Sequence, residues 1–307
     1  MGVRVEAIHN PAQSMPSGGA PRQNIVGRLP GQQDQLTADG PVIGEPWPTV
    51  SVVIPTLNEA RNLPHVFAQL PPSVHEVIVV DGHSVDDTVA VARQLRPDVV
   101  IIRQNRRGKG NALACGFEAA TGDIIVMVDA DGSADPGEIP LFIQALLDGA
   151  DFAKGTRFAA GGGSCDITRL RRLGNWILSA LVNVLCHTKY SDLCYGYNAF
   201  WQRHVPAFGL TVNSDIPAGS GTRLWGDGFE VETLINIRVA QAGLKVIEVP
   251  SYEHERIHGV SNLNAASDGW RVLRTIIAES YYHHRRVLTG TESAARSVAR
   301  RQKATVR

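Results

Sequence analysis

Three short, mostly apolar runs stand out in the first half of the chain. They are Val50–Ile54, Val77–Val80 and Ile124–Val128, and each is rich in β-branched residues and is followed by polar residues. Continuous runs of this length, bounded by turn residues, are typical of strands covered on both faces of a parallel sheet. The pattern therefore predicts buried parallel strands whose carboxyl ends are polar.

Segments with helical periodicity alternate with these strands. Apolar residues recur at three- and four-residue spacing after Asn58, which we expect to cap the first helix. Helices are predicted over 58–70, 88–95, 112–119 and 136–147, and further strands over 99–103 and 151–158. Alternation at this spacing predicts an α/β fold in which helices flank a mostly parallel central sheet within a single domain.

Polar side chains follow the three strand ends. Asn58 and Glu59 follow the first strand, Asp81 follows the second, and Asp129 and Asp131 follow the third. In open α/β sheets the carboxyl ends of the strands form the ligand-binding edge. Residues i and i+2 of an extended chain point the same way, so Asp129 and Asp131 could hold Mg²⁺ or Mn²⁺ together with a nucleotide diphosphate. The alternative is that Asp-Ala-Asp-Gly forms only a polar turn.

Two basic residues are candidate anion contacts. Lys109 lies between Gly108 and Gly110 before a predicted helix, so both its charge and free backbone N–H groups can approach a phosphate. A solvated basic turn is the alternative. Arg256 precedes a turn that contains Gly259, and its guanidinium suits a diphosphate or a phosphate-bearing acceptor because it offers paired donors.

Asp192 and Glu230 are candidate bases on the acceptor side. Asp192 stands among small and aromatic residues in the segment 190–201. It could instead be a charge near the acceptor, or cap a helix. Glu230 falls in the first turn of a helix predicted after Gly226, where the helix dipole favours an anion without any catalytic role.

Composition narrows the class of protein. The chain has 307 residues, of which 43% are hydrophobic, enough for one large α/β domain. Its 30 basic and 30 acidic residues cancel, so we expect no nucleic-acid partner. Four cysteines without a CxxC pair indicate reduced thiols and a cytoplasmic protein. No apolar stretch reaches the roughly 20 residues that span a bilayer.

The chain also divides by composition. Residues 1–48 are rich in Pro, Gly, Gln, Ser and Asn, which predicts a disordered or loosely attached leader. We expect the folded domain over 49–265, an amphipathic helix over 266–290 and a basic disordered tail over 291–307. This helix and a second one, predicted over 169–187, combine basic and aromatic residues with an apolar face. Such faces suit an anionic membrane surface, or could simply cover the sheet.

The order and spacing of these motifs resemble inverting family 2 glycosyltransferases of the GT-A fold, in particular the dolichol- or polyprenyl-phosphate mannosyltransferase type. The similarity runs from about residue 49 to 265. It is carried by Pro55-Thr-Leu-Asn-Glu59, Asp81, Gly108-Lys-Gly110, Asp129-Ala-Asp131, Gly155-Thr-Arg157, Asp192 with Gly196, and Arg256-Ile-His-Gly259-Val-Ser261. The resemblance implies a Rossmann-like sheet and a sugar nucleotide donor.

Site roles follow from the resemblance. It implies that Pro55, Glu59 and Asp81 line the base and ribose, that Asp129 and Asp131 serve the metal and diphosphate, and that Lys109, Arg157 and Arg256 contact anions. The implied reaction moves a hexose of the mannose or glucose type from a GDP- or UDP-sugar to a polyprenyl phosphate, with Mg²⁺ or Mn²⁺. The enzyme would then act at the inner face of the membrane, peripherally or through a membrane partner protein.

Two other functions remain open on the residues alone. A transferase with a soluble hydroxyl acceptor would need a base such as Asp192 or Glu230, whereas a phosphate acceptor is already anionic. A sugar-phosphate nucleotidyltransferase also uses a Rossmann-like sheet and a metal. That class would want a Gly-rich, basic loop after the first strand, where this chain has the acidic segment Pro55-Thr-Leu-Asn-Glu59.

Overall fold

The computed structural model describes residues 47–212, 224–259, 267–283 and 285. Only Trp47 and Pro48 of the predicted leader are among them. The remainder of that leader, the predicted tail over 291–307 and Ser261 of the late motif lie outside the described residues.

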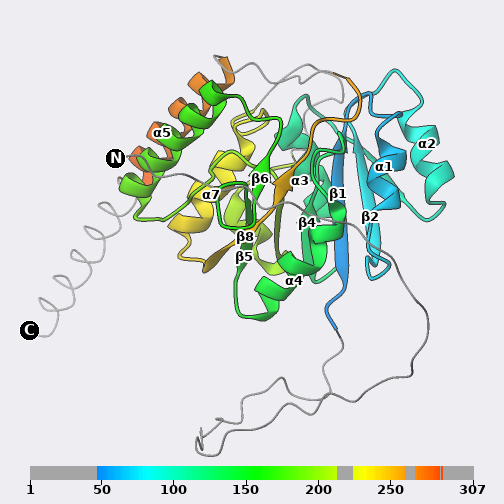
Figure 1. Ribbon diagram of the computed structural model, residues 1–307, viewed down its shortest axis with the longest axis horizontal. Coiled ribbons are helices and arrows are strands. Elements are labelled where there is room, and N and C mark those ends of the chain that lie inside the picture. Colours follow the sequence, from blue (N-terminus) through cyan, green and yellow to red (C-terminus); the bar gives the residue numbers. More distant parts are fainter. Residues whose placement is uncertain (1–46, 213–223, 260–266, 284, 286–307) are drawn as a thin grey trace, which may run out of the picture. The chain divides into compact units, whose positions relative to one another are not determined.

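A seven-stranded sheet forms the centre of the described chain (Figure 1). Its strands are β1 (Val50–Thr56), β2 (Glu76–Asp81), β3 (Val100–Arg103), β4 (Ile124–Met127), β5 (Phe152–Thr156), β7 (Asn198–Trp201) and β8 (Val246–Pro250). They lie in the order β3-β2-β1-β4-β7-β5-β8, and β7 is antiparallel to both of its neighbours while all other pairs are parallel. The predicted mostly parallel sheet is therefore confirmed.

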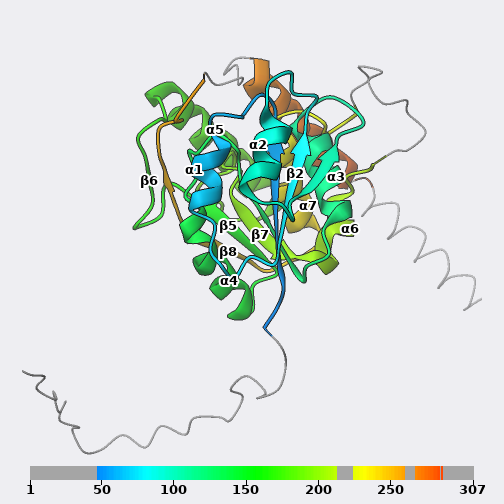
Figure 2. The same cartoon turned by 90° about the vertical axis from the view of Figure 1, so that its right-hand side faces the viewer.

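Helices cover both faces of this sheet (Figure 2). On one face lie α1 (Leu63–Ala68), α2 (Thr88–Leu95), and η1 (Pro136–Glu138) with α4 (Ile139–Leu147); on the other lie α3 (Lys109–Ala119), η2 (Gln202–His204) with α6 (Val205–Phe208), and α7 (Val231–Gln241). Along β1, Val52 and Ile54 pack in the core on the face covered by α1, α2 and α4, and Val53 packs in the core on the opposite face. Successive strand residues face opposite sides, so a sheet covered on both sides requires apolar residues at consecutive positions.

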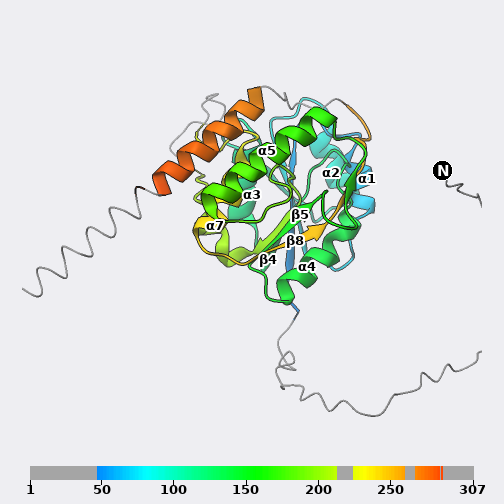
Figure 3. The same cartoon turned by 60° about the vertical axis from the view of Figure 1, so that its left-hand side comes forward.

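A third layer lies outside α7. The long helix α5 (Arg169–Cys186) and a helix over 267–283 run side by side (Figure 3), and Val182, Ile237, Val272 and Ile276 form the small core that joins them to α7. A separate two-stranded parallel sheet pairs β6 (Gly163–Ser164) with β9 (Tyr252–Glu253). Within the described ranges, no helix has the length and apolar character needed to cross a bilayer.

Two predicted helix starts were wrong. The first helix begins at Leu63, because Asn58 adopts a left-handed conformation with φ of 60° and does not cap it. Instead, the Asn58 side chain accepts a hydrogen bond of 2.8 Å from the Val85 backbone N–H, which ties the β1 end to the β2 end. The third helix, α3, begins at Lys109, three residues before its predicted start.

Candidate active site

A cavity of about 1490 Å³ opens at the carboxyl ends of β1 and β4. Pro55, Thr56 and Glu59 line it from the β1 end, and Asp129 and Asp131 line it from the β4 end. Asp131 also forms the predicted polar turn, since its Oδ1 accepts hydrogen bonds from Ser133 N (3.0 Å) and Ser133 Oγ (2.7 Å). The turn and the carboxylate pair are therefore one structure, with Oδ1 used for the turn and Oδ2 facing other partners.

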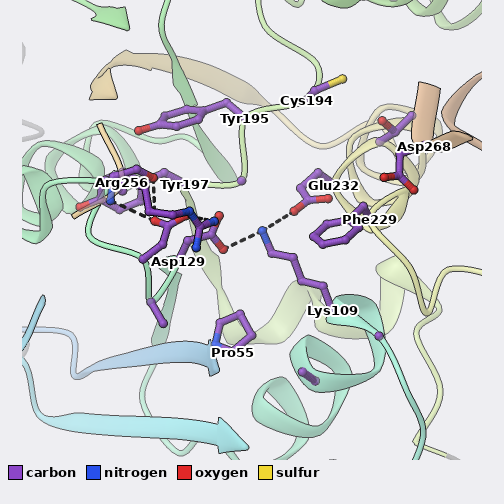
Figure 4. A pocket seen from close by; sticks show the side chains of 18 of the residues that line it. Pro55, Lys109, Asp129, Cys194, Tyr195, Tyr197, Phe229, Glu232, Arg256 and Asp268 are labelled. Atoms are coloured by element: carbon purple, nitrogen blue, oxygen red, sulfur yellow. Dashed lines mark hydrogen bonds and ion pairs between the residues drawn. The ribbon is translucent and has the colours of Figure 1, made fainter. Parts of the chain in front are cut away.

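Lys109 bridges two carboxylates across this cavity (Figure 4). Its Nζ lies 2.6 Å from Asp129 Oδ1 and 2.6 Å from Glu232 Oε1. Burial disfavours the lysine charge, but Asp129 and Glu232 outweigh it and hold the pKa of Lys109 above its usual value. Burial raises the pKa of Glu232, whereas the charge of Lys109 lowers it. Lys109 and Glu232 each favour the charged form of the other.

Glycines allow the Lys109 loop to lie against the start of α7. A β-carbon on Gly108 would lie 2.0 Å from Asp227 O, and one on Gly110 would lie 1.8 Å from Gly226 O. Buried Arg106 fastens the contact, with Nε 2.8 Å from Asp227 Oδ2 and Nη2 2.9 Å from Asp227 Oδ1. The glycines of the basic loop are thus required by close backbone approach, and the loop sets the position of Lys109.

Arg256 holds the other carboxylate of the pair. Its Nη2 lies 2.7 Å from Asp131 Oδ2, and its Nη1 lies 3.4 Å from Glu59 Oε1. Burial raises the pKa of Glu59, while hydrogen bonding from Asn62 and the charge of Arg256 act in the opposite direction. Two cations and four carboxylates are therefore joined in one ion-pair cluster in this cavity, a combination suited to a metal and a diphosphate.

Residues 51–205 match the family described as glycosyl transferase family 2. The chain belongs to this family. The polyprenol monophosphomannose synthase of Mycolicibacterium smegmatis is 30% identical over 259 residues, which cover 78% of this chain and 90% of that protein. The undecaprenyl-phosphate mannosyltransferase of Micrococcus luteus is 30% identical over 233 residues, covering 73% of this chain and 91% of that protein.

Solved structures agree on the fold of this family 2 glycosyltransferase. The glucosyl-3-phosphoglycerate synthase of Mycobacterium tuberculosis aligns with a TM-score of 0.57 at 24% identity, over 76% of this chain and 80% of that chain. That crystal structure contains Mn²⁺, UDP and glucosyl-3-phosphoglycerate. The predicted GT-A fold and the predicted glycosyltransferase class of enzyme are confirmed.

The carboxylate pair of the family 2 transferase fits a divalent cation that shares its shell with a substrate. Asp129 and Asp131 supply hard oxygen ligands, the type that Mg²⁺ and Mn²⁺ prefer. Among the residues that the structure describes, no group of three or more His, Cys, Asp or Glu side chains is placed to hold a metal. A cation at this pair would therefore complete its shell with phosphate and water oxygens.

Arg157 and Asp192 form a buried unit in this transferase. Arg157 donates from Nε (2.7 Å) and Nη2 (2.9 Å) to the two oxygens of Asp192, and its Nη1 lies 3.0 Å from Glu253 Oε2. Burial disfavours the Asp192 charge, but Arg157 outweighs this and lowers the pKa of the carboxyl. Asp192 is fully buried and is not among the described residues that line the cavity. Its contacts are those of a carboxylate that holds Arg157 in place, and its role as a base stays a prediction.

Some of the remaining predicted residues line the cavity, and others lie behind the residues that line it. Pro55 lines the cavity, whereas Asn58, Asp81 and Glu230 are not among its described lining residues. Asp81 is buried and accepts a hydrogen bond of 3.0 Å from Ser84 N, so it shapes the turn of which Gly82 and His83 line the cavity. Glu230 precedes α7 as its cap position, outside the predicted first turn, and its Oε1 accepts from Gly228 N at 3.2 Å.

Glu232 and Gly196 are functional candidates that the sequence argument missed or left without a role. Glu232 lines the cavity and lies two residues after Glu230, the glutamate that the sequence predicted. Gly196 faces the same ion pairs, because a β-carbon there would lie 3.1 Å from Glu232 Oε1 and 3.5 Å from Asp129 Oδ2. The sequence shows two glutamates in this segment. Deciding which of them faces the cavity requires the first residue of the helix to be known to within one position.

Proposed function

We propose that this chain is an inverting, metal-dependent glycosyltransferase that moves a hexose from a GDP- or UDP-sugar to a polyprenyl phosphate. The observation that carries the proposal is the cluster of Asp129, Asp131, Lys109 and Arg256 inside one cavity at the sheet edge. The names of the two relatives that match over most of their length support a polyprenyl phosphate as acceptor.

The donor occupies the β1 and β2 end of the cavity in this proposal. Pro55, Thr56, Gly82, His83 and Gln104 line that end and offer a surface for the base and ribose. Glu59 lies between this surface and the carboxylate pair. The diphosphate then reaches Asp129 and Asp131, where the metal, when bound, offsets its negative charge.

The reaction needs charge stabilisation at the leaving group. An oxygen of the acceptor phosphate forms a bond to the anomeric carbon, on the face opposite the nucleotide. The bond from that carbon to the diphosphate oxygen breaks, and its electron pair leaves with the nucleoside diphosphate. Lys109 and Arg256 hold the oxygens that gain charge, which is the kind of preorganised stabilisation that contributes most to such steps. Displacement from the opposite face inverts the anomeric centre.

The acceptor enters beside the amino-terminal halves of α5 and of the helix over 267–283. Leu170, Leu178 and Val272 from these two helices line the same cavity as the carboxylate pair, so an apolar chain can lie beside them while its phosphate reaches the donor. Both helices also expose large apolar side chains to solvent, including Trp176 (66% exposed) and Trp270 (68% exposed). These features support peripheral binding at a membrane surface, with basic residues of α5 beside the lipid headgroups.

A soluble hydroxyl acceptor is the second candidate, because Glu232 supplies a carboxylate inside the cavity. Burial raises the pKa of Glu232, whereas the charge of Lys109 lowers it. Its oxygen is held by Lys109, however, and release of that contact would have to accompany proton transfer. A phosphate acceptor needs no such step.

The test is a transfer assay with the purified full chain, Mn²⁺ and either GDP-mannose or UDP-glucose. Undecaprenyl phosphate in detergent is compared with undecaprenol and with glycerol as hydroxyl acceptors. We expect a glycolipid product with the phosphate only, loss of that product with EDTA, and inverted anomeric configuration by NMR. Transfer to the alcohols but not to the phosphate would favour the second candidate, and unchanged sugar nucleotide under all conditions would refute both.

A further inference from the structure

Protein cations already engage one oxygen of each aspartate in the carboxylate pair. Asp129 Oδ1 is held by Lys109 at 2.6 Å, and Asp131 Oδ2 is held by Arg256 at 2.7 Å. Asp131 Oδ1 accepts hydrogen bonds from Ser133. A metal that binds Asp131 through Oδ2 must therefore take the place of Arg256.

Arg256 is the cation that can leave. Lys109 is fixed by two contacts of 2.6 Å, and its side chain is 13% exposed. The side chain of Arg256 is 22% exposed, and its second contact, to Glu59, is long at 3.4 Å. Release of Lys109 would leave Glu232 buried without its charged partner, which is costly, whereas Arg256 can turn toward the cavity.

Backbone hydrogen bonds hold the chain on both sides of Arg256. His254 N donates to Ser133 O at 2.8 Å, and Ile257 N donates to Asp131 O at 3.3 Å. The segment that carries Arg256 is thus fastened to the turn that carries Asp131, and only side-chain rotation is needed. The guanidinium therefore remains within reach of whatever binds at Asp131.

Charge explains why this exchange should depend on the nucleotide. Glu59, Asp129, Asp131 and Glu232 are four carboxylates joined to only two cations, which leaves a formal charge of −2 when all four are ionised. A diphosphate alone meets net repulsion from this cluster, and a metal alone displaces Arg256 from Asp131 without supplying a new anion for it. Metal and diphosphate together satisfy both requirements.

We propose that Arg256 is a gating residue that holds Asp131 in the free enzyme and transfers to the donor diphosphate when a divalent cation takes that carboxylate. This proposal rests on the proposed function of the same site. It makes binding of metal and nucleotide strongly cooperative, and by linkage each raises the affinity of the other by the same factor. Arg256 then weakens binding of the metal alone and strengthens binding of the nucleotide in the presence of metal.

The test is calorimetric titration of wild-type protein and Arg256→Gln with Mn²⁺ alone, and with UDP or GDP at saturating Mn²⁺. Removing the competing guanidinium should tighten Mn²⁺ binding in the absence of nucleotide by about fivefold, the upper range for one partly exposed ion pair. The same variant should bind the nucleotide more weakly with Mn²⁺ present. Arg256→Lys, which keeps the charge, should give values between the two.

Arg171→Gln is the matched control, because Arg171 lines the same cavity but pairs with Asp166 at 3.2 Å. It should leave Mn²⁺ affinity unchanged. Unchanged or weaker Mn²⁺ binding by a folded Arg256→Gln protein overturns the gate, while Mn²⁺-dependent nucleotide binding by the wild type keeps the proposed function standing. Absence of Mn²⁺-dependent nucleotide binding in the wild type overturns the gate and the donor site together.

Discussion

Gly196 and Lys109 meet across the cavity with no room for a side chain between them: a β-carbon on Gly196 would lie 3.0 Å from Lys109 Nζ. The same atom would lie 3.1 Å from Glu232 Oε1. The fully buried Lys154 donates a hydrogen bond of 3.1 Å to Tyr195 O, which fixes the segment that carries Gly196. The glycine is therefore the point at which the β5–β7 side of the sheet touches the ion pairs.

Gly196→Ala should displace the Lys109 ammonium and weaken donor binding. Because the atoms it meets are the ends of flexible side chains, we expect folding to survive and nucleotide affinity with Mn²⁺ to fall by about tenfold, roughly 1.4 kcal/mol. Thermal shift with UDP or GDP and Mn²⁺ measures this. Gly174→Ala is the control, since a β-carbon at Gly174 meets nothing within 4 Å; an equal loss in both variants would contradict the role of Gly196.

Glu232→Gln should lower the transfer rate, and Glu230→Gln should not. Losing a charge-assisted contact at a buried position is worth roughly 1.5–3 kcal/mol, or about ten- to a hundredfold in kcat/KM. Steady-state transfer to the lipid phosphate gives this ratio for each variant. A larger effect for Glu230→Gln would show that the predicted glutamate is the functional one and that Lys109 does not depend on Glu232.

Asp192→Asn should unfold the protein more readily without selectively removing a base. Arg157 would keep its charge in a buried position with only Glu253 opposite, at an expected cost of about 3–5 kcal/mol in the free energy of unfolding. Denaturant titration at neutral pH measures the loss, and Asp166→Asn at an exposed pair is the control. Wild-type stability with a transfer rate reduced by several orders of magnitude would instead support the base.

The same carboxylate predicts an acid limb of stability. Since the folded-state pKa of Asp192 is below its usual value of 3.8, the folded protein binds fewer protons there than the unfolded chain in acid. Its stabilising contribution is therefore complete well above pH 3.8 and is lost as the pH falls toward the folded-state pKa. Denaturant titrations from pH 6 to pH 3 should show a shallower loss in Asp192→Asn than in the wild type, and identical slopes would contradict the assignment.

Replacement of both exposed tryptophans of the outer helices, Trp176→Ser with Trp270→Ser, should weaken membrane binding. Each large apolar side chain that leaves water contributes about 1.5–3 kcal/mol, so we expect at least a tenfold lower partition onto vesicles with anionic lipid. Co-sedimentation measures the bound fraction. Trp47→Ser removes an exposed tryptophan outside these helices (80% exposed) and should bind as the wild type does. Equal binding by all three proteins would remove the support for a membrane surface.

Local sequence determined strands β1 to β5 and the position of the carboxylate pair, whereas β7 and β8 were not predicted. The apolar runs became β1, β2 and β4 because consecutive apolar residues are stable only when both faces of a strand are covered. Helix α2 has the predicted bounds, Thr88–Leu95. Asp129 and Asp131 reach the cavity because a strand that ends in a polar turn must present those side chains at the sheet edge.

Tertiary structure decided which acidic residues lie in the cavity and which are buried behind it. Each residue of a helix is rotated by about 100° from the last, so the start of α7 at Val231 turns Glu232 toward Lys109 and leaves Glu230 outside the cavity. Asp192 looked free along the sequence, but β5 brings Arg157 to it from 35 residues away, and the pair is buried together. Such long-range ion pairs depend on strand order and register, which a local pattern of hydrophobic and polar residues does not contain.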